Sequence, residues 1–227
     1  MSFEQDGFFS PEVDEFRDAM RTTMPTKVWF DYVMDLNRIG LDLLLHAQTL
    51  NTDNAAFARH AIFIRTHQSF QAALLLIERG LIGDARIVLR SGVEGAIAIA
   101  ALGSDPAFAD SLVEAHHYQQ RKIARVLLDN PDYQASCGAE EIAIVRWVKD
   151  EFDAMEAASG RKLHDINWAV IASQHCRDLY HLLYRLFSND GAHTTLRTLD
   201  RYVVADSNMR ITAFKAALDG EGGYRSP

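Results

Sequence analysis

The chain has 227 residues, of which 48% are hydrophobic and 24% charged, and this globular composition excludes a disordered chain. Its formal net charge of -8 gives no general basic field to attract duplex DNA, although a local basic patch could still bind a short RNA segment. The two cysteines, Cys137 and Cys176, predict free thiols in a reducing compartment. The N-terminus lacks the apolar segment of a signal peptide, and the most apolar run, 96–102, is too short to span a bilayer. We therefore expect a cytoplasmic protein with no membrane contact.

Helical periodicity dominates the chain and predicts an all-α, single-domain bundle of about seven to nine helices. A first short helix is expected at Ser10-Pro11, because Ser10 can cap it and Pro11 fits its first turn. Between Trp29 and Leu50 the apolar residues recur at spacings of three and four, which is the stripe of an amphipathic helix.

The next three helices fill the middle of the chain. One is expected over 53–79, where Gly80 ends it. Residues 83–102 are apolar on most of the helix circumference, which predicts the central helix of the bundle. A fifth helix begins at Asp105-Pro106 and ends before Asn130-Pro131.

A sixth helix is expected over 140–158, and a seventh runs from a cap at Asp165 or Asn167 to a break at 189–191. Two short helices follow over 195–204 and 209–218, and no segment alternates long enough to predict a strand.

These elements group into three parts of one domain. They are an N-terminal extension with a short helix (1–27), a core bundle (28–205), and a C-terminal helix with a tail (206–227). The glycine-rich tail is typical of a linker, which suggests the hypothesis that the natural chain continues past Pro227.

Polar side chains gather where the seventh helix is expected to end. Arg185 and Ser188 lie in its last turns, and Asp190 and His193 follow in the break. Arginine can neutralise a phosphate, and histidine can act as a general acid or base near pH 7, so Arg185, Asp190 and His193 are the catalytic candidates. Alternatively, Asp190 caps the break and His193 bonds to a neighbouring backbone group.

A second group, Arg86, Arg90 and Glu94, is spaced four residues apart on the central helix. Such a series on an exposed face stabilises a helix only weakly, but its apolar surroundings predict partial burial here. The group is therefore either a structural clamp or the floor of a polar pocket.

Glu114 and His117 have the Glu-x-x-His spacing of the ligand pair in di-metal helical bundles. The nearest second copy, Asp190 with His193, lies in the helix break, and Glu94 could add a carboxylate. Glu114 and His117 are therefore weak metal candidates, and no cofactor is predicted. The chain also lacks the glycine-rich phosphate-binding motifs and the nucleophile elbow of α/β-hydrolases.

Two segments resemble an uncharacterised, bacterial, all-helical family of unknown function. Its members show Arg-x3-Glu on one helix, which Arg90 and Glu94 match, and a later Tyr-Arg-x2-Ser-x-Asp-Ala-Ala-His-Pro segment. The chain matches the latter from Tyr184 onward, with Gly191 for the usual alanine and Thr194 for the usual proline. The likeness covers residues 55 to 205 and implies no established activity. The binding candidates are Arg86, Arg90, Glu94, Tyr184 and Ser188.

A more distant likeness is to HEPN-type helical domains, many of which are dimers and metal-independent ribonucleases. In these domains an arginine is followed by a polar residue, then by four to six further positions, and then by a histidine. Seven residues separate Arg185 from His193 here, which departs from that pattern.

Three functions remain open. The first hypothesis is a binding or regulatory module without catalysis. The second is a HEPN-like, metal-independent ribonuclease or nucleotide-acting enzyme that uses His193 and Arg185, and the third is a metal-binding bundle. A homodimer, an RNA and a protein are the partners that the sequence leaves open.

Overall fold

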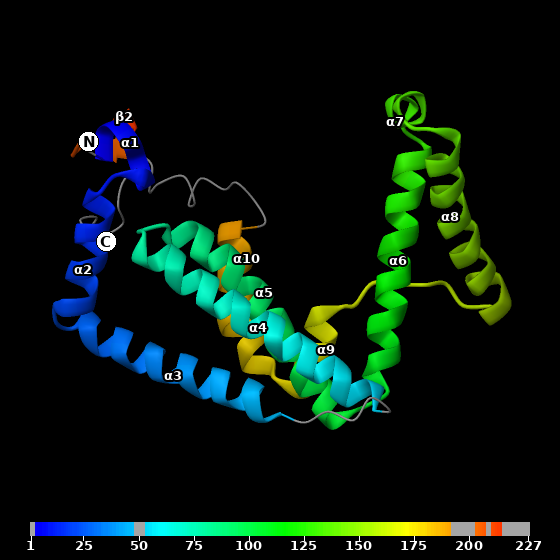
Figure 1. The fold of residues 1–227 in the computed structure, drawn as a ribbon, viewed down its shortest axis with the longest axis horizontal. Helices are drawn as coiled ribbons and strands as arrows, with labels where there is room; N and C mark the ends of the chain where they lie inside the picture. The colour runs from blue at the N-terminus through cyan, green and yellow to red at the C-terminus, as the bar shows by residue number, and fades with distance from the viewer. Residues whose placement is uncertain (1–2, 48–52, 192–202, 208–209, 215–227) are drawn as a thin grey trace.

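The computed structural model describes residues 3–47, 53–191, 203–207 and 210–214 (Figure 1). The elements are α1 (Phe3–Asp6), η1 (Gly7–Phe9), α2 (Glu12–Thr22), α3 (Thr26–His46), α4 (Asn54–Glu78), α5 (Ile82–Ser104), α6 (Phe108–Leu128), α7 (Pro131–Ser136), α8 (Ala139–Ser159), α9 (Trp168–His175), η2 (Leu179–Tyr184), α10 (Arg185–Gly191), β1 (Val203–Ala205) and β2 (Ile211–Phe214). The predicted all-α, multi-helix architecture is confirmed.

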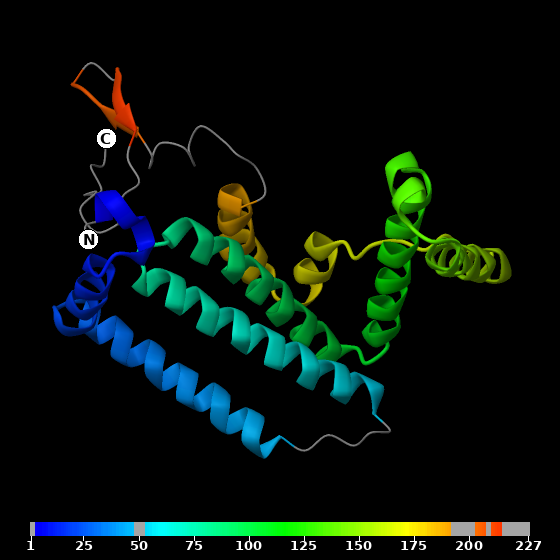
Figure 2. The ribbon, with the colours of Figure 1, turned by 45° about the horizontal axis from the view of Figure 1, so that its top comes forward.

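The helices α4 and α5 lie side by side along most of their length and form the centre of the molecule (Figures 1 and 2). Their backbones approach closely because α5 presents glycine to α4: a Cβ added at Gly95 would lie 2.0 Å from Thr66 Oγ1. Asp53 caps α4 by accepting a hydrogen bond from the Ala56 amide at 2.9 Å. The predicted central position of the fourth helix is therefore confirmed.

Two small apolar clusters make up the core around α5. One consists of Ala55, Ala98, Ala101, Leu102 and Phe108. The other consists of Val93, Ile97 and Ala172, on which side chains of α9, η2 and α10 pack. Most of these residues are small, so helix packing is close while the buried apolar area remains modest.

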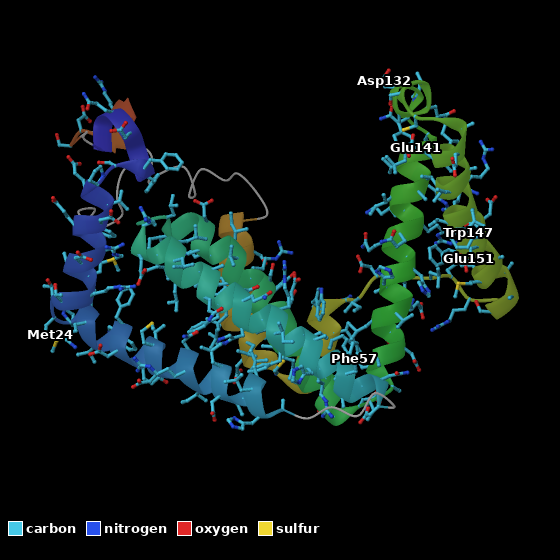
Figure 3. The ribbon with its side chains drawn as sticks, in the orientation of Figure 1. Met24, Phe57, Asp132, Glu141, Trp147 and Glu151 are labelled. Carbon is cyan, nitrogen blue, oxygen red and sulfur yellow. The ribbon has the colours of Figure 1, made fainter. Side chains whose placement is uncertain are left out.

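The helices α6 and α8 form an antiparallel arm that projects from this centre (Figure 1). Trp147 and Glu151 lie along α8 (Figure 3). Inside the arm, Arg121 is buried and forms ion pairs with Glu156 and, at 3.5 Å, with Asp153. Arg121 therefore links α6 to α8 through ion pairs across the arm.

On the opposite side, α3 is the outermost helix and packs on α4 (Figure 2). Gly40 is its buried residue and lies against His67, while Gln71 donates a hydrogen bond to Asn37 at 2.9 Å. The predicted helix is present, but its apolar stripe is solvent-exposed: Trp29 is 67% and Ile39 is 57% exposed. Such a stripe ordinarily faces a core.

Several predictions about the C-terminal third are wrong. The expected continuous seventh helix is divided into α9, the π-helix η2 and α10, with an extra irregular turn at Cys176. In place of the helix predicted for 209–218, Ile211–Phe214 form β2, which pairs antiparallel with β1 (Val203 opposite Phe214). The helix predicted for 195–204 falls mostly on 195–202, outside the described residues, and its end belongs to β1.

Within the described residues, α5 is the one helix long and apolar enough to cross a membrane by length and composition. It packs against α4 on one side and against α9 and α10 on another, as a core helix does, although only 28% of its most apolar stretch is fully buried.

Candidate functional site

The two halves of the family-like pattern meet through Arg90 and Tyr184. Arg90 lies on α5, and its Nη2 donates a hydrogen bond to the Tyr184 hydroxyl at 3.0 Å. The Arg90 Cζ also lies 5.2 Å from the centroid of the Tyr184 ring. One helical turn further, the Glu94 carboxylate is 3.5 Å from the same nitrogen. The Arg90 cation therefore contacts both a phenol and a carboxylate.

This cluster is half-buried: the side chains of Arg90 and Glu94 are 32% and 27% exposed. Burial by itself lowers the pKa of Arg90, but the hydrogen bond to Tyr184 and the charge of Glu94 outweigh it and raise the pKa. Arg90 is therefore a permanent cation at this position.

Tyr184 is the last residue of the π-helix η2, which places it beside a second tyrosine. The rings of Tyr180 and Tyr184 stack with centroids 5.0 Å apart and planes inclined by 17°. A π-helical turn inserts an extra residue per turn and often marks a functional site. Here it produces an aromatic wall next to the Arg90 cation.

The polar segment that follows carries the remaining candidates. Arg185 is exposed at the start of α10, and Ser188 is half-buried one turn after Tyr184. Asp190 lies in α10 without a described side chain, and His193 lies outside the described residues. The structure thus unites Arg90, Glu94 and Tyr184 and leaves Arg185 at the surface.

Two polar atoms in this region are buried and have no hydrogen-bond partner among the described residues, namely Arg90 Nε and Ser188 Oγ. Buried polar groups are satisfied in the great majority of cases. An orphaned donor and an orphaned hydroxyl on two helices that pack together are therefore groups that a ligand could satisfy.

The direction of the chain places Ser188 toward Arg86. Trp168 packs near Leu102 at the end of α5, whereas Tyr184 bonds to Arg90 a few turns earlier, so the segment runs antiparallel to α5. Ser188 continues in the same direction by one turn, toward the turn that carries Arg86. The predicted polar group on α5 thus faces the polar segment 184–188.

A shallow hollow of about 420 Å³ adjoins the aromatic wall. It is lined by Asp165, Ile166, Asn167, Trp168, Ala169, Tyr180 and Tyr184. Asp165 and Asn167 are exposed and belong to the segment that leads into α9. The hollow therefore combines aromatic rings with hydrogen-bonding side chains on one side of the cluster.

Glu114 and His117 have other partners. Buried Glu114 forms an ion pair with Arg161 and has His164 Nδ1 at 2.6 Å from its Oε1. His117 stacks on Phe152 with centroids 4.7 Å apart. Within the described residues, no three histidine, cysteine, aspartate or glutamate side chains are grouped as a metal site requires.

Sequence reasoning missed the hollow and the buried charges of the arm. The hollow depends on the break after α9, and the sequence has no glycine or proline at this break. For Arg121 the sequence did contain a signal, because Arg121 lies seven residues after Glu114 and therefore on the same face of α6. In the structure both side chains are buried.

Residues 57–210 match a family of unknown function, DUF5677, and this range contains α5, η2 and α10. No curated protein and no solved structure matches the chain. The match covers well over half of the chain, which therefore belongs to the DUF5677 family.

Proposed function

We propose that this protein is a cytoplasmic binding module whose ligand carries an anionic group and a planar ring, as a nucleotide does. The observation that carries the proposal is the pair of buried, unpartnered polar atoms, Arg90 Nε and Ser188 Oγ, on neighbouring helices. A polar group of the ligand that reached either atom would satisfy it.

The guanidinium group of Arg90 favours an anion. Arg86 lies one turn earlier on α5, and the Glu94 carboxylate lies 3.5 Å from Arg90 Nη2, so the ligand would share this cation with Glu94. Guanidinium groups bind phosphate and carboxylate oxygens with charge-assisted hydrogen bonds.

The aromatic wall favours a planar ring next to that anion. Tyr180 and Tyr184 line the hollow, and a base that stacks on such a ring gains about 1–3 kcal/mol. At the rim, Asp165 accepts hydrogen bonds from Gln119 and from the Ile166 amide, and Asn167 Oδ1 accepts one from the Val170 amide, so the side-chain nitrogen of Asn167 would donate to the edge of the base. A single nucleotide would place its base in the hollow of about 420 Å³ and its phosphate toward Arg90, which bonds to Tyr184 outside the lining of the hollow.

Isothermal titration calorimetry with a panel of purine and pyrimidine mononucleotides tests the proposal. We expect binding by the wild type, and Arg90→Met should weaken it at least tenfold. Arg146→Met, which removes an exposed arginine of α8, is the matched control and should bind normally. Absence of binding to every nucleotide, or equal binding by both variants, would refute the proposal.

A metal-independent ribonuclease is the second candidate. It is favoured by the position of Arg185, exposed at the start of α10, and by His193, which follows the end of that helix by two residues in the sequence. His193 would act as general acid or base and Arg185 would stabilise the charge on phosphate. Cleavage of a mixed RNA that survives a chelator and disappears in His193→Ala would establish this activity.

A further inference from the structure

The exposed stripe of α3 follows a heptad spacing. Trp29, Tyr32, Leu36, Ile39 and Leu43 are separated by three, four, three and four residues. Their exposed fractions are 67%, 56%, 41%, 57% and 54%. The rings of Trp29 and Tyr32 already pack edge to face, with centroids 6.5 Å apart. We name these five residues the α3 seam.

The seam does not serve the core of its own chain. The face of α3 that contacts α4 carries Asn37 and Gly40, which lie against Gln71 and His67. The seam is rotated away from that face, and α3 is the outer layer of the molecule (Figure 2). Met24, 66% exposed at the corner between α2 and α3, extends the apolar surface (Figure 3).

We propose that a second copy of this chain covers the α3 seam, with the two α3 helices packed antiparallel in a homodimer. A three-four spacing of apolar residues is the pattern that inserts into the surface of another helix. The spacing is nearly self-complementary about Leu36, since Tyr32 and Ile39 lie four and three residues from it. Trp29 and Leu43 are both seven residues from Leu36, so a two-fold axis at Leu36 places each opposite the other.

The available area suffices for a dimer. A 21-residue helix is about 30 Å long, and two such faces in contact remove roughly 1,200 Å² from water, the lower end of the range for stable interfaces.

The charges beside the seam do not oppose this contact. Lys27 pairs with Asp31, and Arg38 pairs with Asp35 at 2.6 Å, all within α3. The remaining carboxylate of α3, Asp42, lies 3.1 Å from His46 Nδ1. A second copy would therefore meet a flank on which each charged side chain already has a neighbour within its own helix.

Sedimentation velocity of the full chain at micromolar concentration tests the dimer. We expect a species of twice the 25.5 kDa chain mass, and Leu36→Asp should convert it to monomer with unchanged far-UV circular dichroism. Val126→Asp places the same charge on an exposed apolar position of α6, 63% exposed, and should remain dimeric. A monomeric wild type would overturn the proposal. Binding of such a monomer to lipid vesicles through the seam would assign the surface to a membrane and would overturn it equally.

Disulfide cross-linking tests the orientation without a disruptive charge. With Cys137 and Cys176 replaced by alanine, Leu36→Cys should form a covalent dimer on mild oxidation, because Leu36 lies at the two-fold axis. Trp29→Cys should not link to itself but should link to Leu43→Cys in a mixture of the two proteins. Efficient Trp29→Cys self-linking, or a dimer without Leu36→Cys linking, would refute the antiparallel seam.

Discussion

The guanidinium of Arg90 contacts Tyr184 in two ways, through a 3.0 Å hydrogen bond to its hydroxyl and through the face of its ring. These residues are 94 positions apart in the sequence. The contact joins the central helix α5 to the π-helix η2, so the integrity of the candidate site and the docking of the C-terminal segment depend on the same pair.

Tyr184→Phe should lower the free energy of unfolding by about 1.5 kcal/mol, because it removes a hydrogen bond to a charged donor while the ring remains. Urea denaturation followed by circular dichroism measures the change. Tyr118→Phe, on α6, is the matched control and should cost less than 0.5 kcal/mol. Equal losses in the two variants would show that the Arg90 contact contributes nothing.

Gly40→Ala should destabilise the protein, because the new Cβ would lie 2.4 Å from the Cε1 atom of buried His67. We expect a loss of about 1–2 kcal/mol, even though alanine is the better helix former by about 1 kcal/mol. Thermal unfolding measures it.

Gly92→Ala is the control for this prediction, since its Cβ would meet nothing closer than the Ser69 Cβ at 3.7 Å. That variant should gain about 0.5–1 kcal/mol from helix propensity alone. In a His67→Ala background, the penalty of Gly40→Ala should shrink. If the penalty persists there, the clash with the imidazole is not its cause.

Arg121→Met should loosen the α6–α8 arm. The Arg121 side chain is 7% exposed, and its loss leaves Glu156 and Asp153 without their buried cation. Because those carboxylates retain partial access to water, we expect a loss of about 2 kcal/mol instead of the 3–5 kcal/mol of a fully buried pair. Lys122→Met, at the exposed neighbouring position, should be close to neutral. Hydrogen exchange within α6 and α8 localises the effect.

Acid should weaken the same arm. A hydrogen bond from Lys149 lowers the pKa of Asp153, and one from Arg121 lowers the pKa of Glu156, in both cases against the effect of burial. A carboxyl group with a lowered pKa in the folded state stabilises it above its unfolded pKa of about 4, and the contribution disappears as the pH falls further.

The stability lost between pH 5 and pH 3, measured by urea denaturation, should therefore be smaller in Asp153→Asn than in the wild type. Glu151→Gln, which changes an exposed carboxylate on the same helix, should lose as much as the wild type (Figure 3). An equal loss in Asp153→Asn would contradict the role of this carboxylate.

The sequence predicts the helix ends that carry a local signal. Asp53, the Asn130-Pro131 pair and Gly160, whose φ is +63°, mark helix ends by capping and backbone geometry, and the helices there lie where they are expected. The break at Cys176 was missed because helical periodicity continues across it without glycine or proline. A strand of three residues, such as β1, is too short for alternation to reveal.

Only part of the candidate site could be predicted from the sequence, because the contact that forms the site is not local. The family-like pattern supplied Arg90, Glu94 and Tyr184, but their contact is tertiary and joins segments far apart in the chain. The α3 seam was visible as a periodic stripe, yet periodicity does not distinguish a face covered by the same chain from one that awaits a partner.

Cys176 should react with alkylating reagents more slowly than Cys137. Burial against the Val93, Ile97 and Ala172 cluster raises the pKa of the Cys176 thiol, so less of the reactive thiolate is present near neutral pH. Iodoacetamide at pH 8, followed by peptide mass spectrometry, should label Cys137 first in the native protein, and both residues alike in urea. Tyr184→Phe should reduce the difference in labelling rate between the two cysteines, because it weakens the docking onto α5 of the segment that follows Cys176. Native Cys176 labelling as fast as that of Cys137 would show that α9 and η2 do not pack stably on the central helix.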